Sequence, residues 1–149
     1  MISDLVGVVR RARPLTNAYL RGGLDPALRE RVMVAVSRVN ACRGCTFVHE
    51  RWAHRAGVTS DDLQAIGLGD LGALDARDRA AVAYAAALAV ARFRGPIATD
   101  LAASVSDHLT PDELAAVDAL ARMMALANLS ANTAEGLFGW LPGRVTPAG

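Results

Sequence analysis

Signals that begin and end helices recur along the whole chain, whereas the alternating apolar and polar pattern of strands is almost absent. The clearest helix start is Thr110–Glu113, a capping box with proline at the first helical position. Asp25–Pro26 is a second start of this kind, and Leu28, Val32 and Val36 follow it at helical spacing. These signals predict an all-α fold of several packed helices.

Prolines, glycines and capping residues also predict where each helix begins and ends. The expected helices cover approximately residues 3–13, 15–21, 26–40, 42–56, 60–66, 76–92, 99–108 and 111–135. A glycine-rich linker is expected over residues 67–72. Because the chain has 149 residues, we expect a single helical domain over residues 1–141 and a flexible tail over 142–149.

The composition suits close packing of helices against one another. The chain contains 30 alanines and only 5% aromatic residues, and alanine is the best helix former. The apolar fraction of 52% is high for a lone soluble monomer. Surplus apolar surface of this kind often forms a subunit interface, so we expect a homo-oligomer.

The charges exclude several classes of function. Sixteen basic residues oppose fifteen acidic ones, and no charge block indicates a nucleic-acid partner. All sixteen are arginine, which excludes Schiff-base chemistry through a lysine. No apolar run reaches the roughly 18 residues that span a bilayer, and residues 1–20 are a poor signal peptide, so we expect a cytoplasmic protein without a membrane partner.

Two closely spaced cysteines in a cytoplasmic protein call for a catalytic, redox or metal explanation. On a helix, Cys42, Cys45 and His49 lie within about 60° of one another, and Cys45 and His49 are i and i+4 neighbours. A neighbouring imidazole can take the proton of a thiol, and a helix N-terminus favours the thiolate. A second cysteine one turn away can then close a disulfide. Glu30, on the preceding helix, has the reach to orient His49.

Other interpretations of these residues remain open. The cysteines can be small buried apolar residues, or two ligands of a zinc ion with His49 as the third. A fourth zinc ligand is not evident, because His54 faces another side of the helix and His108 is remote in sequence. Glu30 can simply be a first-turn acid near a helix N-terminus.

The spacing Glu30-x11-Cys42-Arg43-Gly44-Cys45-x3-His49 resembles the signature of the alkylhydroperoxidase D-like, or carboxymuconolactone decarboxylase, superfamily. The segments flanking the signature agree with it, and the strong match covers about residues 25–66. The resemblance implies an all-α fold that assembles into trimers or multiples of trimers. It also implies a cysteine-based alkyl hydroperoxide reductase or disulfide reductase of the antioxidant type, with no bound metal or other cofactor.

In that family the second cysteine, here Cys45, attacks the peroxide. The first, here Cys42, resolves the product and exchanges with an external dithiol or lipoyl-type protein reductant. Glu30 and His49 match the proton relay, so these four residues are the expected catalytic residues. One position departs from the best-known members, which carry histidine directly before the second cysteine where this chain has Gly44. The alternatives are a decarboxylase-like lyase and a non-enzymatic, redox-responsive interaction protein.

Overall fold

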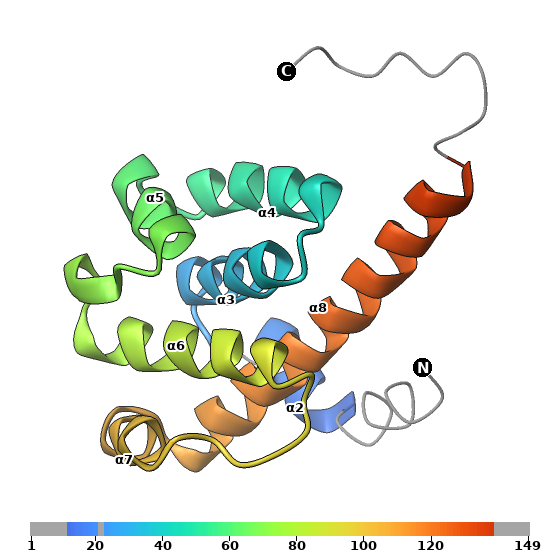
Figure 1. Ribbon diagram of the computed structural model, residues 1–149. Helices are drawn as coiled ribbons and strands as arrows, with labels where there is room; N and C mark the ends of the chain where they lie inside the picture. The colour runs from blue at the N-terminus through green and yellow to red at the C-terminus, as the bar shows by residue number, and fades with distance from the viewer. Residues whose placement is uncertain (1–11, 21–22, 139–149) are drawn as a thin grey trace.

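The structure is a computed structural model that describes residues 12–20 and 23–138. Every regular element in this part of the chain is helical, which confirms the all-α prediction (Figure 1). The elements are α2 (Ala12–Leu20), α3 (Pro26–Val39), α4 (Arg43–Arg55), α5 (Ser60–Leu68), the 3-10 turn η1 (Leu71–Ala73), α6 (Ala76–Val90), α7 (Thr99–His108) and α8 (Pro111–Phe138).

The helix starts are fixed by the capping residues that the sequence indicates. The Asp25 side chain accepts a hydrogen bond from the amide of Leu28 at 2.8 Å, and Pro26 opens α3. The Glu113 carboxylate accepts from the amide of Thr110 at 2.8 Å, and the Thr110 hydroxyl accepts from the amide of Glu113 at 3.3 Å. Each cap satisfies amides that have no partner within the helix, so these bounds follow from local sequence.

Two expected breaks are wrong. Pro14 does not separate two helices, because it lies in the first turn of described helix α2, where its missing N–H needs no partner. The expected linker over residues 67–72 is partly regular, since α5 runs through Gly67 and ends at Gly69, whose φ of 74° is left-handed. The helix expected over residues 3–13 lies almost entirely outside the described residues, as does the expected tail over 142–149.

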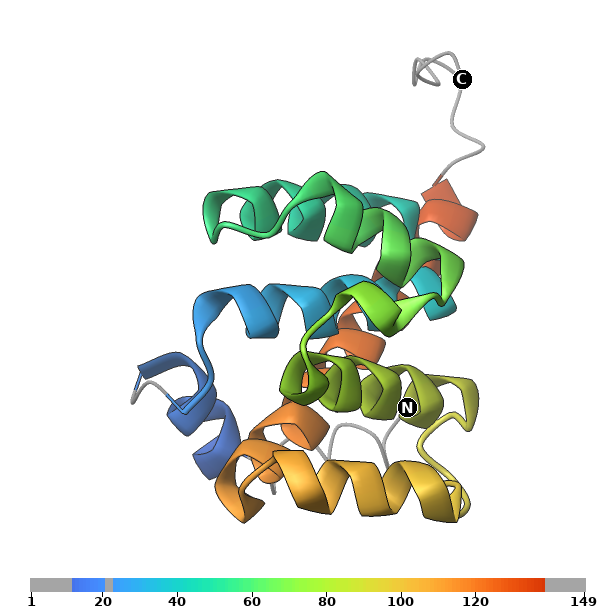
Figure 2. The ribbon, with the colours of Figure 1, turned by 90° about the vertical axis from the view of Figure 1, so that its left-hand side faces the viewer.

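The helices stack in layers around α3. Turned by 90°, the molecule shows α4 and α5 on one side of α3 and α6 on the other, with α7 beyond α6 (Figure 2). Helix α8 crosses this stack and contacts α2, α3 and α6. Helix α3 is therefore the central element, and it carries Glu30 to the side that α4 covers.

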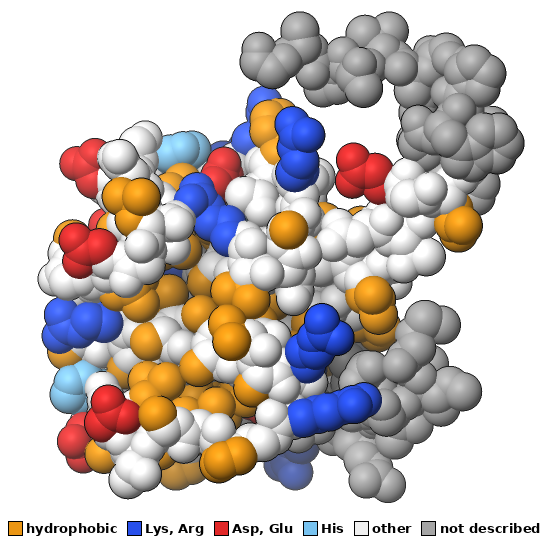
Figure 3. All heavy atoms as spheres, viewed as in Figure 1, with side chains coloured by type: hydrophobic (Ala, Val, Ile, Leu, Met, Phe, Trp, Pro, Cys, Tyr) orange, Lys and Arg blue, Asp and Glu red, His pale blue; other side chains and the backbone are white. Residues whose placement is uncertain are grey.

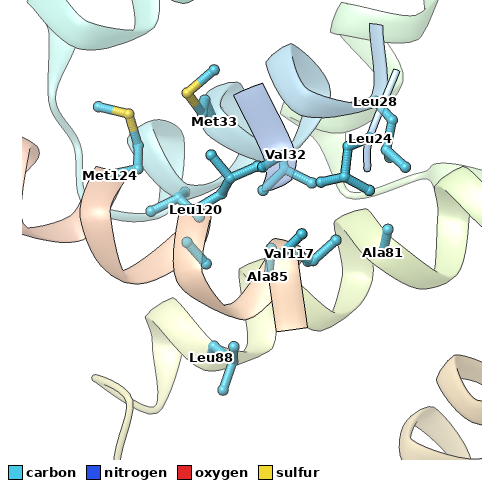
Figure 4. Packing of buried hydrophobic residues seen from close by; sticks show 14 of the residues in the cluster. Leu24, Leu28, Val32, Met33, Ala81, Ala85, Leu88, Val117, Leu120 and Met124 are labelled. Atoms are coloured by element: carbon cyan, nitrogen blue, oxygen red, sulfur yellow. The ribbon is translucent and has the colours of Figure 1, made fainter. Parts of the chain in front are cut away.

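The main core lies where α3, α6 and α8 meet (Figure 4). Leu28 and Val32 of α3 face Ala85 of α6 and Val117 and Leu120 of α8, and all five are fully buried. Alanines on α6 allow close approach of its neighbours, as the alanine-rich composition predicts. A second, smaller cluster packs α3 against α4, α5 and the start of α6.

Helix α8 differs from the others in length and exposure. By length and apolar composition alone, Pro111–Leu137 could cross a membrane, although the sequence shows no uninterrupted apolar run. Its first two thirds, however, supply core residues such as Val117, Leu120 and Met124. The remainder projects from the body and exposes apolar side chains, including Leu129 and Leu137 (Figure 3). The apolar character of the first part therefore reflects burial in the core.

Candidate redox site

The short turn between α3 and α4 places the first cysteine. Ala41 adopts a left-handed φ of 52°, and its amide donates to the carbonyl of Arg38 at 3.0 Å. The amide of Cys42 donates to the carbonyl of Ser37 at 2.9 Å, and Cys42 becomes the N-cap of α4. The predicted location of the cysteine pair at the N-terminal end of a helix is therefore confirmed.

Cys42 and Cys45 are joined by a disulfide, with 5.3 Å between their Cα atoms. The two residues differ in exposure. Cys42 is only 2% exposed, whereas Cys45 is partly exposed and packs along the edge of the main core. In the oxidised pair, Cys45 is therefore the more exposed of the two residues.

Glu30 and His49 form a pair between α3 and α4. Glu30 Oε2 lies 2.9 Å from His49 Nδ1, and the two side chains are 2% and 17% exposed. Glu30 lies in the second turn of α3, so its interpretation as a first-turn acid is wrong. A carboxylate accepts hydrogen bonds only, so it selects the tautomer with the proton on Nδ1 and leaves Nε2 to accept a proton.

The other histidine of α4 lies apart from this pair. His54 is exposed, and its Nδ1 lies 3.1 Å from the carbonyl oxygen of Val58. This agrees with the helical geometry, which puts His54 on another face of α4 than His49.

An aromatic and cationic cluster next to Glu30 has no clear sequence signal. The Arg29 guanidinium stacks over the Tyr19 ring at 4.6 Å, and Arg29 Nε lies 3.7 Å from Glu30 Oε1. The Tyr19 hydroxyl contacts the Met33 sulfur at 3.4 Å. Burial raises the pKa of Tyr19, Arg29 opposes that rise, and the Glu30 charge adds to it. This cluster supplies a positive charge close to the buried carboxylate.

Helix α8 holds the α3–α4 turn through buried amides that sequence reasoning missed. Asn128 is fully buried, and its Oδ1 accepts from Nδ2 of Asn40 at 3.1 Å while its own Nδ2 donates to the Ser37 hydroxyl at 3.3 Å. Nδ2 of Asn132 donates to the carbonyl of Asn40 at 2.9 Å. Because Ser37 and Asn40 flank the backbone that leads to Cys42, α8 positions the cysteine from a distance.

A cavity of about 760 Å³ adjoins this turn between α3, α6 and α8. Asn40 and Ala41 line it, but neither cysteine does. Among the described residues, no group of three or more His, Cys, Asp or Glu side chains could hold a metal ion. Helix α4 thus carries both the disulfide-bonded cysteine pair and His49, the imidazole of the pair with Glu30.

Residues 10–71 match the model of the carboxymuconolactone decarboxylase family. The match spans α2 to the start of η1, includes all four candidate residues, and confirms the resemblance found in the sequence. A search of the curated proteins finds no match to the chain. The match to this family model and the cysteine pair are consistent with redox chemistry of the alkylhydroperoxidase D-like kind.

Proposed function

We propose that this protein is a thiol-dependent peroxidase or disulfide reductase that cycles Cys42 and Cys45 between dithiol and disulfide. One observation carries the proposal: the bonded cysteine pair lies on the same helix as His49, whose Nδ1 is 2.9 Å from buried Glu30. A thiolate is the reactive form of cysteine, and an imidazole oriented by a carboxylate is a group that can generate it.

In the oxidative half-reaction, His49 takes the thiol proton of Cys45. The thiolate attacks one peroxide oxygen, the O–O bond breaks, and the leaving alkoxide receives the proton from His49. Cys45 is then a sulfenic acid. The Cys42 thiolate attacks this sulfur, hydroxide leaves as water after protonation, and the disulfide forms. Each turnover reduces one hydroperoxide to an alcohol and water.

An external dithiol or lipoyl-type protein reductant then restores the two thiols, which needs no bound cofactor. The Cys45 side is partly exposed, and partly exposed cysteines near helix N-termini are the reactive class. The substrate we propose is a small-molecule alkyl hydroperoxide, and the antioxidant role follows from its reduction.

We also infer that the active form is a homo-oligomer, a trimer or a multiple of it. Phe47 is 61% exposed and Trp52 51% on the outer face of α4, and Leu137 is 59% exposed on the projecting end of α8. Exposed apolar surface on two separate elements is typical of a subunit interface. Sedimentation velocity should give a multiple of the 15.6 kDa chain, and Trp52→Glu should lower it. A monomer in the wild type would contradict this inference.

The proposal is tested by steady-state peroxide reduction with a panel of dithiols, comparing wild type with Cys42→Ser and Cys45→Ser. Cys45→Ser should lose peroxide turnover and the intramolecular disulfide. Cys42→Ser should lose turnover but still form a sulfenic acid, which dimedone traps. Full turnover by Cys45→Ser would sink the mechanism.

The same variants separate the alternatives. A lyase in the decarboxylase manner retains its activity after loss of both cysteines. A redox-responsive interaction protein forms the disulfide readily but gives negligible turnover with every dithiol. Elemental analysis near one zinc per chain would replace the redox interpretation with a metal site.

A further inference from the structure

We propose that the external thiol which reduces the disulfide attacks Cys45 and not Cys42, so that the same sulfur receives both the peroxide oxygen and the reductant. This inference rests on the proposed function. It differs from what the family resemblance implies, which is that the reductant exchanges with Cys42. The starting state for this step is the bonded pair that the structure contains.

Access to the two sulfurs is the first argument. A thiolate attacks a disulfide sulfur from the side opposite the bond that breaks, so the attacked sulfur needs open space on its far side. Cys42 is 2% exposed, and its backbone amide is tied to the carbonyl of Ser37. Cys45 is partly exposed, and neighbouring Gly44 is exposed with no atom within 4 Å of the position a Cβ would occupy. An incoming thiol therefore meets a buried residue at Cys42 and a partly accessible one at Cys45.

The leaving group is the second argument. Attack on Cys45 releases Cys42 as a thiolate, and Cys42 is the N-cap of α4 with no side-chain capping bond in the disulfide state. An N-cap side chain normally accepts from the amides of the second and third helical residues, here Gly44 and Cys45. The released thiolate gains these donors and the partial positive charge of the helix N-terminus. A more stable thiolate leaves faster, so the fold favours Cys42 as the leaving sulfur.

The step balances as an exchange between two dithiols. The incoming thiol loses its proton to His49 or water, its sulfur bonds to Cys45, and the electron pair of the broken disulfide goes to Cys42. The second thiolate of the reductant attacks the reductant sulfur in this mixed disulfide. Its attack releases Cys45, which takes a proton. The Cys42 thiolate takes the other proton that the dithiol lost, from His49 or water, so the protein gains two electrons and two protons and the dithiol leaves as a disulfide.

The test maps the mixed disulfide on oxidised wild-type protein. Oxidised protein is exposed briefly to glutathione, quenched with acid, alkylated with N-ethylmaleimide and digested with trypsin. Trypsin cleaves after Arg38, Arg43 and Arg51, so peptide 39–43 carries Cys42 and peptide 44–51 carries Cys45. We expect glutathione on peptide 44–51 and maleimide on peptide 39–43, with at least tenfold preference over the reverse. Equal labelling, or glutathione mainly on peptide 39–43, overturns the proposal.

Two further measurements test whether the labelling preference depends on the fold and whether a second reaction shows the same preference. The preference should fall towards one in guanidinium chloride, since it depends on the fold; an unchanged ratio there overturns the structural cause. Glutathione disulfide should label reduced Cys42→Ser at least tenfold faster than reduced Cys45→Ser. Equal rates overturn the proposal. This measurement does not depend on the lifetime of the mixed disulfide on wild type. No assay here contains peroxide. Loss of peroxide turnover with the labelling preference intact therefore counts against the proposed function alone.

Discussion

Glu30 Oε2 lies 2.9 Å from His49 Nδ1, and the contact joins the central helix α3 to the helix that carries both cysteines. The Glu30 side chain is 2% exposed, so its carboxylate has almost no contact with solvent. A buried carboxylate needs compensating partners, and here these are His49 and the nearby Arg29. The pair therefore fixes the ring of His49 both in orientation and in tautomer.

Replacing the carboxylate by an amide tests this relationship. Glu30→Gln keeps the shape of the side chain but removes the carboxylate that faces His49 Nδ1. We expect peroxide turnover to fall roughly a hundredfold, the low end of what positioned acid–base catalysis contributes. Glu50→Gln is the matched control, because Glu50 pairs with Arg38 away from the cysteines. Equal losses in the two variants would remove Glu30 from the relay.

The imidazole itself is tested by the reactivity of the thiol. In a Cys42→Ser background, His49→Gln should move the titration of the Cys45 thiol to higher pH, because the group that takes its proton is gone. The rate of iodoacetamide alkylation against pH measures this shift. His54→Gln is the control, since the His54 ring lies against the carbonyl of Val58 and on another face of α4 than His49. An unchanged titration in His49→Gln would exclude His49 from thiol activation.

The sequence predicts those features that depend on neighbouring residues. Asp25 and Thr110 begin their helices as expected because a cap needs only the next three residues. Helical periodicity likewise aligns Cys45 with His49, and it leaves the distance to Glu30 open, since that distance depends on how two helices cross. Pro14 shows the limit of local rules, because its effect depends on where in the helix it falls.

Features that depend on tertiary packing could not be predicted from the sequence. Asn128 contacts Asn40 across 88 residues of sequence, and an asparagine in the middle of a long helix carries no local sign of such a partner. The unequal exposure of Cys42 and Cys45 is a second feature that the sequence does not predict. Helical geometry puts both on one stripe, yet Cys42 is 2% exposed and Cys45 is partly exposed.

The Asn128 network should support both stability and disulfide formation. Asn128→Ala removes one buried and one partly buried hydrogen bond and leaves the Asn40 amide without its acceptor. We expect a loss of about 2 kcal/mol in the free energy of unfolding and slower closure of the disulfide after oxidation. Urea denaturation and stopped-flow oxidation measure the two effects. Ser130→Ala is the control, since its exposed hydroxyl donates only to its own helix; matching behaviour of the two variants would contradict the anchoring role.

An ion pair between α3 and α5 should make stability depend on pH. The hydrogen bond from Arg31, 2.8 Å away, lowers the pKa of Asp62, with burial acting against it. A depressed pKa in the folded state contributes stability above the unfolded value near about 3.9, and this contribution is lost as the pH falls through the folded pKa. Asp62→Asn should therefore cost roughly 1 kcal/mol at pH 7 and almost nothing near pH 2.

Urea unfolding of wild type and variant across this range measures the difference. Asp61→Asn is the comparison, because Asp61 is exposed in the same turn of α5. A cost for Asp62→Asn that stays constant between pH 7 and pH 2 would show that the cap of α5, in which the Asp62 carboxylate accepts from the Thr59 amide, and not the charge, is what Asp62 supplies.

Gly44 tests how far peroxide reduction depends on a second imidazole. The best-known alkylhydroperoxidase D-like proteins have histidine at this position, and here the site is exposed with open space where a Cβ would lie. Gly44→His should therefore fold normally. We expect it to raise kcat/KM for peroxide by supplying a proton donor beside Cys45. Reduction by dithiols should become slower, because the new imidazole narrows the approach of the bulkier reductant to that sulfur. Gly44→Ala restores helix propensity without an imidazole, worth about 0.5–1 kcal/mol, and is the matched control. A gain shared by both variants would assign the effect to the stability of α4, because only the imidazole can move protons.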